Sequence, residues 1–193
     1  MSDRVTQILE AAVRVIAQDG VRGLRVDKLA TEAGVSTALI YYHFKDRAGV
    51  LQAALEHVNH RAQSYTDHAL SSIGGDPRGQ VDAVLLAELQ DPDEIRENSI
   101  AWGELRASAV FHSDLRAPLA ESTRAWNIDI ETLIRAAQDA GSIAPGVDVA
   151  AAAERLTALV EGLSERWHSG SVTLDRARHL LAGAIESELP AAD

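Results

Sequence analysis

Apolar residues recur at spacings of three and four along most of the chain, which is the period of an amphipathic helix. The pattern predicts helices at about 3–19, 26–33, 37–44, 47–72, 77–89, 91–112, 113–140, 148–168 and 173–189. The breaks between them fall at glycine, proline and capping residues. Strand-like alternation is almost absent, so the sequence predicts an all-α protein.

Residues 26–44 contain two short helical patterns that are joined by a tight turn. Gly34 stands where the first helix needs a residue that tolerates positive φ at its C-terminus. Ser36 can accept a hydrogen bond from a free N–H group at the start of the next helix and act as its N-cap. Two helices joined by so short a turn cross steeply, as in DNA-binding helix-turn-helix units.

The second of these helices, at about 37–44, is poor in charge and rich in aromatic residues that form hydrogen bonds. We expect Ile40 and Phe44 to be buried. The positions expected to be less buried are Thr37, Ala38, Tyr41, Tyr42 and His43. Tyrosine and histidine can bond phosphate oxygens while their rings contact sugars and thymine methyl groups, so this surface suits a DNA groove.

The run from residue 20 to residue 51 resembles the N-terminal domain of TetR-family transcriptional regulators. The resemblance is carried by Ala33-Gly34-Val35-Ser36, Ile40-Tyr41-Tyr42-His43-Phe44 and Lys45-Asp46-Arg47. It implies a three-helix DNA-binding domain at 1–46, followed by a helical ligand-binding and dimerisation domain at 47–193. The implied function is that of a DNA-binding regulator, most simply a repressor that a small-molecule effector releases from a palindromic operator.

On this resemblance and on side-chain chemistry, ten residues are predicted to meet DNA: Arg25, Lys28, Ser36, Thr37, Ala38, Tyr41, Tyr42, His43, Lys45 and Arg47. Arg25 departs from the family, which often has Ser or Thr before the first helix of the motif. Arginine has no acceptor with which to cap a helix, and its charge is unfavourable at a helix N-terminus. We therefore hypothesise that Arg25 contacts a DNA phosphate, with a solvated side chain as an equally plausible alternative.

Charge is distributed unevenly along the 193 residues, whose net charge is −11. Residues 1–50 hold seven basic and six acidic side chains, whereas residues 51–193 hold eleven basic and twenty-three acidic ones. The nearly neutral N-terminal part can bind phosphates while the acidic remainder discourages non-specific adhesion. The chain has no cysteine, no signal-peptide pattern and no apolar run long enough to cross a membrane, which predicts a cytoplasmic protein,.

The last two predicted helices carry broad apolar stripes. We expect these stripes to form a homodimer through a four-helix interface, as the family resemblance also implies, and the alternative is packing within one chain. The predicted interface residues are Leu156, Leu159, Val160, Leu163, Leu180, Leu181 and Ala184. A dimer would present two helix-turn-helix units to half-sites about one helical turn, or a multiple of it, apart.

The effector is not identified by the sequence. Candidate ligand-binding residues combine aromatic walls with polar groups: Tyr65, Trp102, Arg106, His112, Trp126 and Trp167,. For each of them a role in the core or in an interface is the competing interpretation. The segment 159–163 resembles the choline-responsive branch of the family, which implies a cationic ligand in an aromatic cage.

Metal and enzyme chemistry have little support in the sequence. One predicted helix contains Glu56, His57 and His60, at spacings that could bring two of these side chains to one face as ligands of a divalent ion,. Solvated side chains are the commoner outcome for such a pattern. No HExxH motif, phosphate loop or nucleophile elbow is present,. We predict no cofactor and no enzyme activity. The alternative is a helical small-molecule-binding protein or enzyme in which the helix-turn-helix is not the main function.

Overall fold

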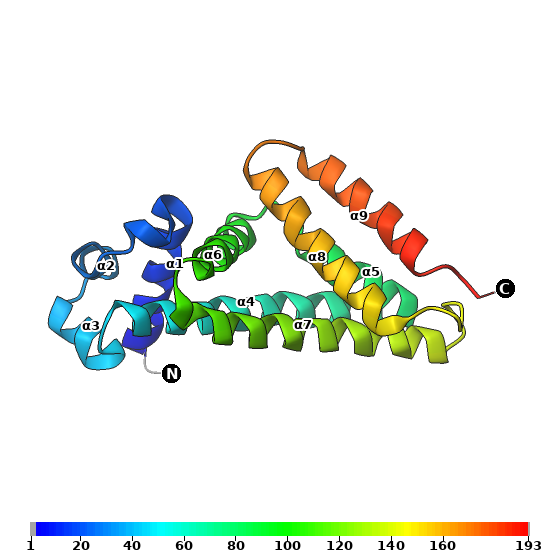
Figure 1. Cartoon of the computed structure of the whole chain (residues 1–193), viewed down its shortest axis with the longest axis horizontal. Coiled ribbons are helices and arrows are strands. Elements are labelled where there is room, and N and C mark those ends of the chain that lie inside the picture. Colours follow the sequence, from blue (N-terminus) through cyan, green and yellow to red (C-terminus); the bar gives the residue numbers. More distant parts are fainter. Residues whose placement is uncertain (1–2, 193) are drawn as a thin grey trace. The chain divides into compact units, whose positions relative to one another are not determined.

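The computed structural model describes residues 3–192, apart from the side chain of Ser72; Met1, Ser2 and Asp193, at the outer ends of the two predicted domains, lie outside the described residues. Helices follow one another along the chain (Figure 1): α1 (Asp3–Gly23), α2 (Val26–Ala33), α3 (Thr37–Phe44), α4 (Arg47–Ile73), α5 (Pro77–Ala87), α6 (Asp93–Ala109), α7 (Ser113–Asp139), α8 (Val149–His168) and α9 (Leu174–Glu188). No strand occurs within residues 3–192, which confirms the all-α prediction.

These residues group into two compact units. The first contains residues up to 62 together with 96–121, and the second contains 63–95 and the residues from 122 onward. Helices α4 and α7 each contribute a part to both units. Helices α1 to α3 therefore share a unit with parts of three later helices. The domain boundary expected after residue 46 concerns function, namely where the predicted DNA-binding domain ends, and it stays a prediction.

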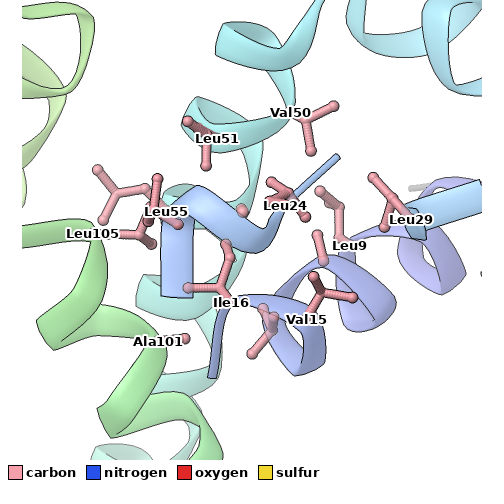
Figure 2. Close-up of a cluster of buried hydrophobic side chains, with 14 of the residues drawn as sticks. Leu9, Val15, Ile16, Leu24, Leu29, Val50, Leu51, Leu55, Ala101 and Leu105 are labelled. Carbon is pink, nitrogen blue, oxygen red and sulfur yellow. The ribbon is translucent and has the colours of Figure 1, made fainter. Parts of the chain in front are cut away.

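The core of the first unit joins α1, α4 and α6 (Figure 2). Its buried side chains include Leu9 and Ile16 of α1, Leu51 and Leu55 of α4, and Ala101 and Leu105 of α6. Leu29, Ile40 and Phe44 of the two short helices belong to the same cluster. The two short helices are therefore held by a core to which a helix far along the chain contributes.

Helix α1 is interrupted near its end, at the position where the sequence predicts its terminus. Gly20 has φ 71° and ψ 171°, a combination that is essentially restricted to glycine,. The chain then makes one further turn, from Val21 to Gly23, before α2 begins. Val21 and Leu24 are almost fully buried, so this short turn is part of the core.

Two of the first unit's helix ends depend on side chains from elsewhere. Pro118 lies inside α7 and has no N–H that could donate to the carbonyl of Asp114, four residues earlier,. The side-chain amide of Gln52 donates to that carbonyl instead, at 3.3 Å. Helix α6 ends at Ala109 rather than near the predicted residue 112. Arg116 donates to the carbonyls of Ala109 and Val110 at 3.0 and 2.9 Å, and these bonds satisfy the end of the helix,.

The second unit has its own core, which is formed by α5, α8, α9 and the later part of α7. Helices α8 and α9 lie side by side as an antiparallel pair (Figure 1). Side chains cap both at their starts: Asp148 accepts from the N–H of Ala151, and Thr173 accepts from the N–H of Arg176,. Arg178 of α9 donates to the carbonyls of Leu86 and Leu89, at 3.2 and 2.6 Å, and so satisfies the end of α5.

Candidate nucleic-acid interface

The turn between α2 and α3 has the predicted geometry. Gly34 adopts the left-handed conformation, with φ 62° and ψ 36°. The N–H of Val35 donates back to the carbonyl of Ala30 at 2.9 Å, which closes the end of α2,. The Ser36 hydroxyl accepts from the N–H of Leu39 at 3.2 Å and caps α3. The predicted conformation of Gly34 and the predicted capping role of Ser36 are therefore confirmed.

Three side-chain interactions hold α2 against α1. The amide of Gln7 donates to the carbonyl of Ala33 at 2.8 Å, next to the turn. Arg14 pairs with Glu32 at 2.9 Å, and Lys28 pairs with Asp19 at 2.5 Å. Lys28, a predicted DNA contact, thus has a carboxylate partner within the protein. A phosphate would have to compete with Asp19 for its ammonium group.

Helix α3 turns an aromatic surface outward. Tyr41 is 51% exposed and Tyr42 is 80% exposed, whereas Ile40 and Phe44 are buried. Thr37 and Ala38 at the start of the helix are also exposed, and His43 is half-buried. The rings of Tyr42 and His43 meet edge-on, with centroids 5.0 Å apart. The apolar side of α3 is therefore committed to the core, and most of the predicted DNA-contacting side chains lie at the surface.

The joint between α3 and α4 has a feature that sequence reasoning missed. Lys45 has φ 65° and ψ −54°, and the N–H of Asp46 donates to the carbonyl of Phe44 at 2.7 Å. This is a γ-turn with positive φ, which is rare and strained for a residue with a side chain. Asp46 then caps α4 by accepting from the N–H of Gly49 at 2.8 Å. Lysine gives no local signal for such a turn, so only the structure could reveal it.

The two arginines predicted to contact DNA lie in different environments. Arg25 precedes α2 with an exposed side chain that forms no cap hydrogen bond, as the sequence predicts for a residue without an acceptor. Arg47 is half-buried, and its guanidinium donates to the carbonyl of Leu24 at 2.8 Å and to that of Val21. Arg47 therefore has an internal role that the sequence did not suggest.

The six candidate effector residues are all half-buried, and they are divided between the units. Trp102, Arg106 and His112 belong to the first unit. The Trp102 indole N–H donates to the Asn59 amide oxygen at 3.0 Å, and the Arg106 guanidinium lies 4.3 Å from the centre of the Trp102 ring. This stacking supplies a structural role for both residues, the alternative stated for them above.

Tyr65, Trp126 and Trp167 belong to the second unit. The hydroxyl of Tyr65 is 3.5 Å from the carbonyl oxygen of Glu94. Trp126 and Trp167 pack against the core of this unit, and the Trp167 ring lies 4.4 Å from that of His168. Burial raises the pKa values of three carboxyl groups of the unit, those of Asp82, Glu88 and Asp129, and for Glu88 the pKa rises to about 7. Sequence periodicity gave no reason to single out these three acids.

His57 and His60 of α4, the two histidines considered above as metal ligands, differ in burial. His57 is buried and neither ring nitrogen has a hydrogen-bond partner, whereas Glu56 and His60 are exposed. Burial, followed by the charge of Arg61, lowers the pKa of His57 below its usual value. Within residues 3–192, no group of three or more His, Asp or Glu side chains is arranged to hold a metal ion.

The predicted dimer residues divide into two sets. Leu156, Val160, Leu163 and Leu181 are buried within the single chain, so their apolar surface does not require a partner. For these four, packing within one chain, the alternative stated above, accounts for the burial. Leu159, Leu180 and Ala184 are only partly buried. The α8–α9 pair also exposes Gly162 and Gly183, where a β-carbon would meet no other atom within 4 Å.

In the described part of the chain, no helix is both long and apolar enough to cross a membrane.

The chain matches known families over most of its length. Residues 8–54 match the bacterial regulatory proteins of the tetR family, and residues 77–190 match the C-terminal domain of BetI-type transcriptional repressors.

Solved structures and curated relatives agree with these matches. A TetR-family transcriptional regulator from Rhodococcus sp. is 47% identical and superposes with a TM-score of 0.90, covering 98% of this chain and 100% of its own. A transcriptional regulator from Saccharomonospora viridis, in complex with choline, is 27% identical with a TM-score of 0.87 and 98% coverage of both chains. The HTH-type transcriptional regulator BetI of Burkholderia lata is 25% identical over 169 residues, which are 88% of this chain and 82% of that protein. The chain therefore belongs to the TetR family of DNA-binding transcriptional regulators, with a C-terminal domain of the BetI type.

Proposed function

We propose that this protein is a homodimeric, cytoplasmic repressor that leaves a palindromic operator when a small organic cation binds. TetR-family proteins are transcriptional regulators and not enzymes, so the enzyme alternative has no support. The observation that carries the DNA-binding part is the outward face of α3, where Tyr41 and Tyr42 stand exposed on a helix that Ser36 caps.

The proposed DNA contacts follow from the exposed positions of the motif. We expect the exposed Thr37, Ala38, Tyr41 and Tyr42 to meet base edges and sugars, and the half-buried His43 to contact the groove beside them,. We assign phosphate contacts to Arg25, Lys28, Ser36 and Lys45. The exposed lysine after α3 adds charge next to an uncharged reading surface, so affinity should fall steeply as salt is added,.

The proposed effector class rests on chemistry and on a relative. The similar regulator from Saccharomonospora viridis holds choline. The second unit of this chain contains Tyr65, Trp126 and Trp167 together with the desolvated carboxyl group of Glu88. Aromatic faces attract quaternary ammonium groups, and a bound cation would stabilise the ionised form of a buried carboxyl group.

We propose that dimerisation uses α8 and α9. The support is the partly exposed apolar set Leu159, Leu180 and Ala184, next to two exposed glycines that allow close approach of helices,. A dimer also fits a palindromic operator, because each half-site then meets one helix-turn-helix.

The test begins with selection of bound duplexes from a random pool by the full-length protein. Enrichment of a palindrome is expected, and an unenriched pool would refute sequence-specific binding. Binding of the enriched duplex is then measured by fluorescence anisotropy with added choline or with its uncharged analogue 3,3-dimethyl-1-butanol. Release by choline alone supports a cationic effector, whereas release by neither compound, or equally by both, contradicts it.

A further inference from the structure

The turn between α1 and α2, residues 20–24, follows the interruption of α1 at Gly20 and contains the buried backbone groups of Val21. The conformation of Gly20 interrupts the hydrogen-bond ladder of α1 just before Val21. Val21 has no exposed surface, so water cannot readily serve its N–H and carbonyl groups. Buried backbone groups of this kind need partners from within the protein.

Side chains from two later helices of the same unit bond to these groups, in addition to the local hydrogen bond from Leu24. The N–H of Val21 donates to Oε2 of Glu104 on α6 at 3.2 Å. The guanidinium of Arg47, the first residue of α4, donates to the carbonyl oxygens of Val21 and Leu24. A β-carbon at Gly20 would lie 2.8 Å from the same Glu104 oxygen, so the carboxylate is seated directly against the interrupted helix.

This turn determines where α2 starts. The N–H of Leu24 donates to the carbonyl of Val21 at 3.2 Å, and the N–H of Arg25 donates to that of Gly23 at 2.9 Å. Helix α2 begins at the next residue and leads through the Gly34 turn into α3. Arg47 follows the α3–α4 joint, so the guanidinium connects the start of the helix-turn-helix with its end.

We propose that Glu104 is a positioning residue for DNA binding, which acts through Val21 and together with Arg47 to fix the helix-turn-helix on the rest of the first unit. Hydrogen bonds to charged groups are stronger than those between neutral groups, which suits a joint that must hold several helices. The role extends the proposed function, because it makes α6 a direct support of the DNA-reading surface although no residue of α6 is expected to touch DNA.

The first measurement needs no DNA. Hydrogen exchange of the Val21 amide, followed by NMR in the full-length protein, is compared among wild type, Glu104→Ala and Glu104→Gln. Alanine removes the acceptor, so exchange at Val21 should accelerate by roughly tenfold or more. Glutamine keeps an acceptor oxygen and should restore most of the protection. A general loss of structure would instead accelerate exchange throughout the core, including Ile16 and Leu55.

The second measurement is the affinity for the operator duplex that the selection yields. Glu104→Ala should bind roughly tenfold more weakly, and Glu104→Gln should stay close to wild type. Glu97→Ala is the matched control, because it removes another carboxylate of α6, paired with Arg61 at 3.3 Å, and should leave the Val21 amide protected. Unchanged exchange at Val21 in Glu104→Ala overturns the proposal, as does a glutamine variant as defective as the alanine one. Failure to find an operator would bear only on the proposed function.

Discussion

The α-carbon of Gly49 faces the carbonyl oxygen of Phe44 so closely that a β-carbon built on it would lie 2.1 Å from that oxygen. The same carbonyl accepts the hydrogen bond of the γ-turn at Lys45. The first turn of α4 is therefore packed against the end of α3, with space for hydrogen only.

Gly49→Ala should disturb this joint. The added methyl group must push Phe44 or the start of α4 away, at a cost to stability of about 1–3 kcal/mol. Operator affinity should fall as well, because α3 loses its fixed position. Urea unfolding and anisotropy measure the two effects, with Gly75→Ala as the control, since a β-carbon there meets nothing within 4 Å. Equal behaviour of the two variants would contradict the close packing.

Substitutions at Lys45 separate backbone strain from charge. Alanine and glycine both remove the ammonium group, but only glycine accepts φ 65° without strain,. We expect Lys45→Gly to be more stable than Lys45→Ala by roughly 1 kcal/mol in urea unfolding. The same pair at Lys28, inside α2, should show the opposite order, because glycine weakens a helix. The same order at both positions would argue against the γ-turn.

Arg25→Ala tests the phosphate contact proposed for this exposed residue. Loss of one phosphate contact should lower operator affinity at low salt and reduce the slope of log affinity against log salt by about one. Binding titrations between 50 and 300 mM salt measure the slope. Arg124→Ala removes an exposed arginine of the second unit and should leave both quantities unchanged. If the Arg25 variant matches this control, its side chain is merely solvated.

The carboxyl group of Glu88 should make stability depend on pH. Burial raises its pKa from 4.5 to about 7, so the unfolded chain releases this proton more readily than the folded protein does. Stability is therefore lost as the pH rises from about 4.5 to 7,. Glu88→Gln has no proton to release, so in urea unfolding its advantage over wild type should grow across this interval. Glu165→Gln removes an exposed carboxylate and should give no such trend.

Gly183→Leu tests dimerisation through α9. A side chain there has open space in the single chain, so the protomer should fold normally and gain slightly from improved helix propensity,. In a dimer that brings the two α9 helices together, the leucine would hold them apart. Analytical ultracentrifugation should then find monomers for Gly183→Leu and dimers for wild type and for Gly146→Leu, which alters an exposed loop. A dimeric Gly183→Leu protein would require a different interface.

The local geometry of the helix-turn-helix could be predicted because each signal acts within a few residues. A glycine at the end of α2 and a serine before α3 determine the turn by their own conformational and hydrogen-bonding preferences. The apolar spacing of α3 likewise identifies Ile40 and Phe44 as its buried side.

Other features depend on contacts between distant residues. Arg47 has the chemistry of a phosphate ligand, and only the folded chain reveals that carbonyls of the α1–α2 turn take up its guanidinium. A helical stripe such as Leu156, Val160 and Leu163 shows which side is apolar without showing what covers it. In the second unit, the covering is the chain's own core.

The exposed tyrosines of α3 have a consequence for selectivity. Contacts made by rings and hydroxyl groups release few counterions, whereas binding to arbitrary DNA depends almost entirely on phosphates and weakens as salt increases. A regulator that reads bases through Tyr41 and Tyr42 should thus lose its non-specific sites faster than its operator when ionic strength rises,. Its selectivity for the operator over other DNA would therefore improve at higher ionic strength, although its total affinity for DNA is lower there.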